Sequence, residues 1–454
     1  GGPYFLKIYE MYNISAIFGN NKLIPRFSKK FVGFHSGFKK VSSDNLESLY
    51  LNIPLTNSKY IKYLYNNEFY IVIVTNSLNF TEKVPQKIFN QIIIDYKNGS
   101  KDVGCHNSLG SHLIFIHDIL ENKLVIVNDY FGSIPLYYYN SENHLIVGTD
   151  FCLIASLLED FKFDQCGIFQ FSCSEYCLGD RTFIEDVNIL KPSTILSFSS
   201  GNVILNKYNY LNITHEKQNF DTLTSYKMLD NLFTNYFKNA IPQNCKISIT
   251  LTGGLDSRLL AGYLKSLNYN ITSFYIGEYG YWDQTFGEDV ANKLNISYNV
   301  YTTDNEHQNN ILESFLNYSS PELSFRHTHF LDSIKQITNN HDIILGGVFG
   351  GEIFGQKNIN RDFNNKIHYL SYLKKFFYKK SGVFDKRDDY FLKNFQNDLL
   401  LTDLELDDNV NNAGTTTTLV QQFDKFIFNG YLNRFILNRS PVVFARNCYY
   451  FTNY

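Results

Sequence analysis

The sequence lacks the features that mark membrane, secreted and strongly charged proteins. No apolar run approaches the ~18 residues of a membrane-spanning helix, and residues 1–4 lack the basic and then apolar order of a signal peptide. The seven cysteines form no C-x-x-C pair, and Cys173 and Cys177 have no nearby histidine or cysteine to complete a metal site. A formal net charge of −3 provides no strong field for nucleic acid. These absences favour a cytoplasmic protein with reduced thiols, no membrane segment and no nucleic-acid partner.

The composition is that of a folded chain of two or three domains, with 44% hydrophobic and 19% charged residues. Up to residue 208, short apolar runs are separated by turn-forming clusters, which predicts stacked antiparallel sheets with a few helices. The predicted strands are 14–18, 69–74, 112–116, 124–127, 145–147 and 195–198. The polar stretch 209–224 predicts a linker between two parts of the chain.

Beyond residue 225 the pattern changes to alternating helices and strands. The predicted order is helix 225–237, strand 246–251, helix 259–267, strand 271–276, helix 286–294, strand 298–301, helix 330–337 and strand 342–345. This alternation predicts a parallel sheet with helices on its faces. Ligands of such sheets bind at the carboxyl ends of the strands.

The stretch LTGGLDSR at 251–258 falls at such an end, directly after the first of these strands. Gly253 and Gly254 lack a Cβ, so phosphate oxygens can approach their backbone N–H groups, and the N-terminus of the following helix attracts anions. Hydroxyls at 252 and 257 add donors, while Asp256 suits a Mg²⁺ ion that also binds phosphate. The loop therefore predicts a magnesium-bound pyrophosphate site. The alternative is a tight turn in which Asp256 or Ser257 only caps the helix.

This loop resembles the S-G-G-x-D-S signature of the asparagine synthetase family. The resemblance continues at 272–277, 283–294, 324–328 and 345–355, and in the N-terminal half at 11–19 and at 129–138, which reads DYFGSIPLYY. It implies an α/β protein with two domains. A glutaminase-like Ntn-type αββα sandwich is expected over 11–208. A parallel-sheet PP-loop ATP pyrophosphatase domain, of the adenine nucleotide alpha hydrolase-like kind, is expected over 225–454.

The resemblance also implies roles for individual residues of this sequence. The expected ATP-binding residues are Leu251, Thr252, Gly253, Gly254, Asp256, Ser257, Ile276, Gly346 and Gly347. The expected catalytic residues are Asp256, Arg326 and Glu352, of which Asp256 and Glu352 are also the expected ligands of Mg²⁺. Glu352 takes the metal-binding role only if the alignment slips by one residue, because Gly351 otherwise occupies that position.

The sequence departs from the family at several functional positions. Tyr12 stands where the glutaminase has its nucleophilic cysteine, and a phenol cannot replace a thiolate, so we expect glutamine hydrolysis to be lost. Val348 stands where the family has a glutamate in its S-G-E-G segment. The segment for the family's catalytic lysine would follow Tyr454, so the second domain is expected to be truncated.

The predicted activity is an ATP-dependent amide ligase that adenylates a carboxylate and releases pyrophosphate. Its partners would be a small-molecule or peptide carboxylate and an amine donor, and a homodimer is left open. The alternatives are a glutamine-dependent asparagine synthetase and a catalytically degenerate nucleotide-binding relative. Three further expectations concern acidic residues. Asp129 is expected to stabilise a turn, and the run 403–408 is expected to be a solvated face. Glu278 and Asp283 are expected to contact the ribose or the second substrate, with helix capping as the equal alternative for Asp283.

Overall fold

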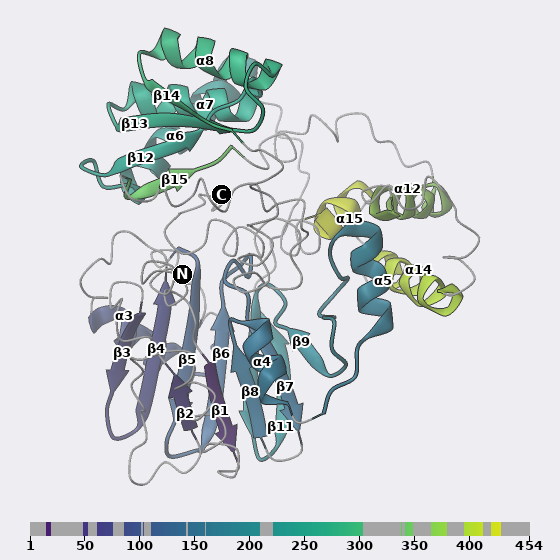
Figure 1. The fold of residues 1–454 in the computed structure, drawn as a ribbon. Coiled ribbons are helices and arrows are strands. Elements are labelled where there is room, and N and C mark those ends of the chain that lie inside the picture. Colours follow the sequence, from purple (N-terminus) through teal and green to yellow (C-terminus); the bar gives the residue numbers. More distant parts are fainter. Residues whose placement is uncertain are drawn as a thin grey trace.

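The computed structural model of the chain shows two sheet-containing parts and a group of helices beside them (Figure 1). It describes residues 15–19, 49–52, 61–75, 86–100, 103, 110–141, 144–158, 160–208, 221–302, 337, 341–347, 365–378, 395–411 and 419–427. Within these residues, no helix combines the length and the apolar character needed to span a bilayer. The five cysteines among them, at 152, 166, 173, 177 and 245, form no disulfide.

Two antiparallel sheets form the N-terminal part. The five-stranded sheet has the order β2-β1-β8-β7-β9 and the six-stranded sheet the order β11-β10-β6-β5-β4-β3. The strands of the first are β1 (Ser15–Gly19), β2 (Leu49–Asn52), β7 (Tyr137–Ser141), β8 (His144–Gly148) and β9 (Val187–Ile189). Those of the second are β3 (Ile61–Tyr65), β4 (Phe69–Thr75), β5 (His112–Asp118), β6 (Lys123–Asn128), β10 (Thr194–Ser199) and β11 (Asn202–Lys207). The six strands predicted from apolar runs are all present.

Alternating side chains of β4 explain why the sheets form a four-layer sandwich. Every residue of this strand is buried, because both of its faces are covered. Tyr70, Val72 and Val74 join the cluster that also contains Ala16 and Phe18 of the other sheet. The intervening residues of β4 pack instead with the buried face of helix α3 (Gln86–Lys97). Helix α4 (Phe151–Leu157) covers the five-stranded sheet, which confirms the predicted αββα order.

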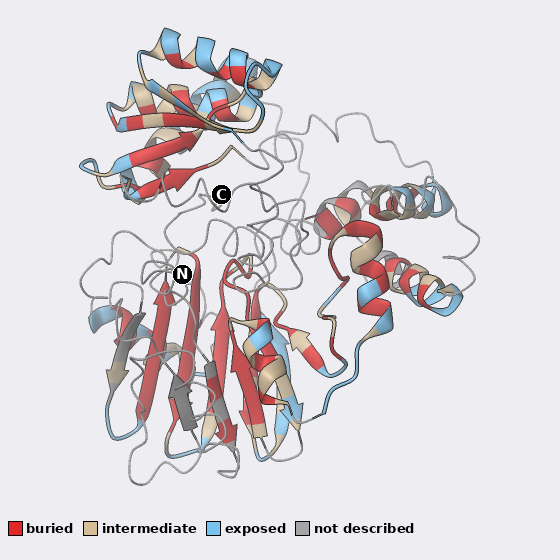
Figure 2. Cartoon of the chain, viewed as in Figure 1, coloured by how far each residue is buried: buried red, intermediate tan, exposed pale blue. Residues whose placement is uncertain are grey.

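The second part contains a four-stranded sheet of order β14-β13-β12-β15, in which all pairs are parallel. Its strands are β12 (Lys246–Thr250), β13 (Asn270–Ile276), β14 (Ser297–Tyr301) and β15 (Ile343–Leu345), and its helices are α6 (Thr222–Ala240), α7 (Leu255–Ser266) and α8 (Trp282–Leu294). Strands β12 and β15 are mostly buried, the edge strand β14 has no buried residue, and the outer side of α8 is exposed (Figure 2). The parallel sheet is confirmed, although α7 and α8 each begin four residues earlier than predicted.

The last group of helices packs against the N-terminal part rather than against the parallel sheet. Helices α12 (Lys366–Tyr378) and α14 (Gln396–Asn411) contact α5 (Gln165–Ser174), and α15 (Leu419–Phe426) contacts α12. The expectation that 403–408 is a solvated face is wrong for Asp403, Glu405 and Leu406, although Leu404 is 50% exposed. Asp403 bonds Lys374 and Tyr378, Glu405 binds Arg181 of the N-terminal part, and Leu406 is fully buried.

Candidate functional site

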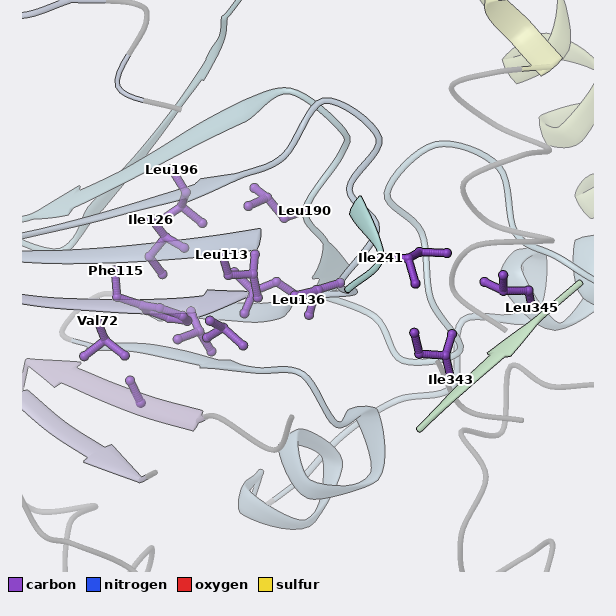
Figure 3. Close-up of a cluster of buried hydrophobic side chains, with 14 of the residues drawn as sticks. Val72, Leu113, Phe115, Ile126, Leu136, Leu190, Leu196, Ile241, Ile343 and Leu345 are labelled. Atoms are coloured by element: carbon purple, nitrogen blue, oxygen red, sulfur yellow. The ribbon is translucent and has the colours of Figure 1, made fainter. Parts of the chain in front are cut away.

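The candidate site lies where the strands of the parallel sheet end. Thr250 of β12 pairs with Phe274 of β13, and Ile249 pairs with Leu345 of β15. Because the three strands are parallel and in register, the glycine loop, Ile276 and the glycine pair after β15 follow at one edge of the sheet. A single cluster of buried hydrophobic side chains joins the sandwich to the part of the chain that holds this sheet. It extends from Leu136 and Leu190 of the sandwich to Ile241, Ile343 and Leu345 (Figure 3).

Hydrogen bonds inside the glycine loop fix its shape. The Ser257 hydroxyl accepts from the Thr252 N–H at 3.2 Å and lies 3.2 Å from the Gly254 carbonyl oxygen, to which it donates. The Thr252 hydroxyl accepts from the Gly254 N–H at 3.2 Å. The two hydroxyls predicted to face phosphate therefore also hold the loop in place.

The N-cap residue of α7 is Gly254, which makes no side-chain capping bond, and Asp256 sits in the first turn of the helix. The alternative in which Asp256 or Ser257 serves as the helix cap is therefore wrong. The helix begins at Leu255, so its first N–H groups lie within the glycine loop itself. This arrangement is the one in which helix N-termini bind anions.

A side chain has no room at Gly347 and little room at Gly253. A Cβ at Gly347 would lie 2.7 Å from the Ser257 nitrogen and 2.8 Å from the Asp256 carbonyl carbon. A Cβ at Gly253 would lie 3.0 Å from the Cβ of Phe286. The end of β15 thus touches the first turn of α7, and the start of α8 touches the glycine loop.

Tyr298 of β14 ties the loop to the neighbouring helix. Its hydroxyl lies 3.2 Å from the Leu251 carbonyl oxygen and 3.1 Å from that of Gln284. Burial, followed by the nearby charge of Glu288, raises the pKa of Tyr298, so the phenol stays a hydrogen-bond donor. A Cβ at Gly287 would meet the same two groups, at 2.5 Å from the Tyr298 oxygen and 2.6 Å from the Leu251 oxygen. The loop therefore rests on tightly packed backbone.

Two family models match the sequence in the predicted order. A glutamine amidotransferase domain matches residues 94–209 and an asparagine synthase domain matches residues 228–419. The chain thus carries a glutamine amidotransferase-type domain followed by an asparagine synthase-type domain, as the resemblance implied. None of the curated proteins searched matches it.

Solved structures that are similar to this chain match it with low TM-scores. A predicted subunit of tRNA methyltransferase from Methanocaldococcus jannaschii is 18% identical over 29% of this chain and 64% of its own, with a TM-score of 0.18. An NH3-dependent NAD synthetase from Campylobacter jejuni is 13% identical over 44% of this chain and 99% of its own, with a TM-score of 0.23. Glutamine PRPP amidotransferase from B. subtilis is 10% identical over 65% of this chain and 61% of its own, with a TM-score of 0.23. The chain spans less than two thirds of the first and third proteins, and scores this low support no argument about function.

Several expected residues of the family site lie outside the described residues. These are Arg326 and Glu352 of the ATP-binding half, the positions Val348 and Gly351, and Tyr12 of the amidotransferase half. The amidotransferase match begins at residue 94 and so leaves Tyr12 outside it. Within the described residues, no group of three histidine, cysteine, aspartate or glutamate side chains could hold a metal ion. The described part of the site thus contributes Asp256 and the backbone of the loop.

Two charged residues, Arg258 and Asp283, lie beside the loop. Arg258 donates from Nε to the Gly254 carbonyl oxygen at 3.2 Å, which keeps its guanidinium at the N-terminal end of α7. The sequence signal for it was its place directly after the predicted phosphate loop. Asp283 lies in the first turn of α8, whose N-cap is Tyr281, so Asp283 does not cap this helix. Its Oδ1 would lie 3.4 Å from a Cβ at Gly253, which places the carboxylate beside the loop.

Asp129 of the amidotransferase half serves the fold, as predicted. Its carboxylate accepts from the backbone N–H groups of His112, Phe131 and Ser133 and from the Ser133 hydroxyl. These bonds close the turn after β6 and join it to β5. The residue is buried, and its hydrogen-bonding capacity is used within the turn.

Proposed function

We propose that the chain is an ATP-dependent amide ligase that activates a carboxylate as an acyl adenylate and releases pyrophosphate. The observation that carries this proposal is the glycine loop at the carboxyl edge of a parallel sheet, inside a matched asparagine synthase domain. ATP would bind along Leu251, Thr252, Gly253, Gly254, Ser257 and Ile276, with Gly346 and Gly347 closing the other side. The close backbone contact at Gly347 and the tight space at Gly253 fit a cradle of bare backbone.

The chemistry assigned to the protein is charge stabilisation and positioning. The N–H groups of the loop and of the first turn of α7 would donate to the departing pyrophosphate. Arg258 lies at the same end of α7 and would add a guanidinium contact to the phosphates. A Mg²⁺ ion bound through Asp256 would add positive charge at the same place. Arg326 and Glu352 remain proposed participants of this site.

A glutamine-dependent asparagine synthetase is the second candidate, because the amidotransferase domain model matches the first half of the chain. The tyrosine at position 12 argues against its glutaminase step. On the proposal preferred here, the first half, from 11 to 208, keeps the fold without that activity, and the second half, from 225, performs the ligation. A cytoplasmic location and a homodimer remain part of the proposal.

ATP–pyrophosphate exchange tests the proposed function. The protein is incubated with ATP, Mg²⁺, labelled pyrophosphate and a panel of amino-acid and short-peptide carboxylates. We expect exchange with at least one carboxylate, and we expect Asp256→Asn to lower it at least ~100-fold because it removes a charge that acts on the leaving group. Asp160→Asn, the same change at an exposed residue of the first half, should leave it unchanged.

Three results would point elsewhere. Bound ATP without exchange for any carboxylate would favour the degenerate nucleotide-binding relative. Release of glutamate from glutamine together with asparagine formation would favour the glutamine-dependent synthetase. Equal exchange in the Asp256→Asn and unmodified proteins would remove Asp256 from the proposed site.

A further inference from the structure

The turn after β13 and the first part of α8 present a group of exposed aromatic side chains. Tyr279, Tyr281, Trp282 and Phe286 are each about half exposed or more, and Tyr279 reaches 76%. The rings of Tyr281 and Trp282 lie 6.0 Å apart, and those of Trp282 and Phe286 lie 6.2 Å apart and nearly perpendicular. We call these four residues the aromatic rim. Contiguous exposed apolar surface is one of the features that mark interaction sites.

The aromatic rim is continuous with the glycine loop. Phe286 has its Cβ 3.0 Å and its Cδ2 3.5 Å from the position of a Cβ at Gly253. The carboxylate of Asp283, one residue after Trp282, lies against the same glycine. A molecule resting on the rim would therefore lie next to the loop proposed to bind the phosphates of ATP.

The backbone of the rim is held in place before any ligand binds. The buried side chain of Gln284 accepts from the Gly280 N–H at 3.1 Å and donates to Glu288 at 2.8 Å. Its own N–H donates to the Tyr281 carbonyl oxygen at 2.9 Å. Aromatic side chains on a fixed backbone lose little conformational freedom on binding, which suits them to recognition.

The charge of this segment selects the kind of molecule that can bind. Residues 277–292 contain four acidic side chains and no lysine, arginine or histidine. Two of them, Asp283 and Glu278, lie close enough to Tyr275 to affect it. Burial is the largest cause of the raised pKa of Tyr275, and the charges of Asp283, Tyr281 and Glu278 raise it further. Arg258 is bonded to the Gly254 carbonyl and is assigned above to the phosphates. A carboxylate would be repelled here, whereas aromatic faces beside acidic groups attract an ammonium ion.

We propose that the aromatic rim, with Glu278 and Asp283, binds the amine substrate as a protonated amine that carries an apolar or aromatic group. This inference rests on the proposed amide ligase, which needs an amine beside its activated acyl group. The bound ammonium ion would release a proton to water, and its neutral nitrogen would then attack the acyl carbon, with AMP leaving as the C–N bond forms. The proposed substrate is a primary amine with an apolar group rather than free ammonia, because ammonia has no apolar group to contact the four rings.

Trp282 is the only tryptophan of the chain and reports binding directly. The full chain is titrated with 2-phenylethylammonium, with the neutral analogue 2-phenylethanol and with the anionic analogue 3-phenylpropanoate. We expect a saturable change in Trp282 emission for the ammonium, at least tenfold weaker binding of the alcohol and no response to the carboxylate. Phe286→Ala and Asp283→Asn keep the reporter and should each weaken the ammonium about tenfold. Phe163→Ala, an exposed ring of the N-terminal part, is the control and should have no effect.

Equal affinity for the ammonium and the alcohol would overturn the inference, as would competition in which ATP displaces the ammonium from the rim. Circular dichroism of each variant excludes loss of fold as the cause of a lost response. Pyrophosphate exchange on the same preparation separates the two proposals. Exchange without any ammonium response refutes the rim alone, whereas an ammonium response without exchange refutes the ligase and leaves an amine-binding surface.

Discussion

At the scale of single residues, the site depends on the absence of side chains. Gly347 faces the backbone of Asp256 and Ser257 at distances that no Cβ can occupy. Gly262, in the middle of α7, has nothing within 4 Å of its Cβ position. The two glycines therefore differ in what they do, although both lie close to the same loop in space or in sequence.

Gly347→Ala should weaken nucleotide binding about tenfold or more, because inserting a methyl group here costs ~1–3 kcal/mol of strain or displaces the loop. Gly262→Ala should leave binding unchanged and stabilise the fold by ~0.5–1 kcal/mol, since alanine favours a helix interior. Isothermal titration with ATP and denaturant unfolding of both variants measure the two effects. Equal nucleotide affinity in the two variants would contradict the close contact at Gly347.

His117 provides a second test at this scale. It is 1% exposed in β5, packs edge-on against Phe18 at 5.2 Å, and neither ring nitrogen has a hydrogen-bond partner among the described residues. Burial lowers its pKa to about 4, against a smaller opposing effect of Asp118. The unfolded chain, with a histidine pKa of about 6.5, thus binds a proton between pH 6.5 and 4 that the folded protein does not.

The contribution of neutral His117 to the free energy of unfolding should therefore be complete above pH 6.5. It should be lost progressively as the pH falls towards 4. The slope is up to ~1.4 kcal/mol per pH unit and the total is about 3 kcal/mol. His117→Leu should remove this part of the pH dependence, whatever its stability at pH 7.5. Urea unfolding of both proteins from pH 7.5 to pH 5 measures it, and parallel curves would contradict a neutral buried His117.

At the scale of elements, α14 connects the two halves of the chain. Arg181 donates to Asp164, the N-cap residue of α5, and to Glu405 of α14, which also accepts from Gln170 at 2.8 Å. Apolar residues of α5 and the turn after it pack with those of α12, α14 and α15 around this charge group. The ion pairs are only partly exposed, so they should contribute more than surface pairs do.

Arg181→Met should lower the free energy of unfolding by about 2–3 kcal/mol, because two partly buried carboxylates lose their partner. Lys97→Met breaks the exposed pair with Glu68 and should cost less than ~0.5 kcal/mol. A double-mutant cycle of Arg181→Met with Glu405→Gln should show coupling of at least ~1 kcal/mol. Additive effects of the two changes would mean that the contact between α5 and α14 does not depend on this pair.

At the scale of the whole molecule, the two halves share a buried apolar cluster. Phe169 and Cys173 of α5 lie in one cluster with Tyr369, Leu373 and Phe377 of α12. The C-terminal helices therefore complete their core with side chains of the amidotransferase half. On the proposal that this half lacks glutaminase activity, the shared core gives a structural reason for its retention.

Residues 221–454 expressed without the first half should aggregate or bind the dye ANS, because removal of α5 exposes the apolar faces of α12 and α14. The full chain should bind little dye under the same conditions. Size-exclusion chromatography and ANS fluorescence compare the two proteins. A monomeric 221–454 fragment with a cooperative unfolding transition would contradict the shared core.

The sequence by itself determined the sandwich strands, the parallel sheet and the glycine loop. Local patterns carry these features, because strand periodicity and a glycine pair after an apolar run depend on neighbouring residues. It also indicated the two domain types, through motifs in a fixed order. The sequence did not predict where the helices begin. Helix α7 begins at Leu255, four residues before the predicted start, because Gly254 can serve as its N-cap without a side chain.

Only the tertiary structure decided what surrounds the loop and what the acidic run at 403–408 does. Phe286, Asp283 and Gly347 meet the loop from two different strand ends, and Glu405 meets Arg181 across more than two hundred residues of chain. No sequence pattern links such pairs, since each partner looks like an ordinary surface or turn residue in its own segment. Packing brings them together because parallel strands align their ends and because α12 and α14 cannot bury their apolar faces without α5.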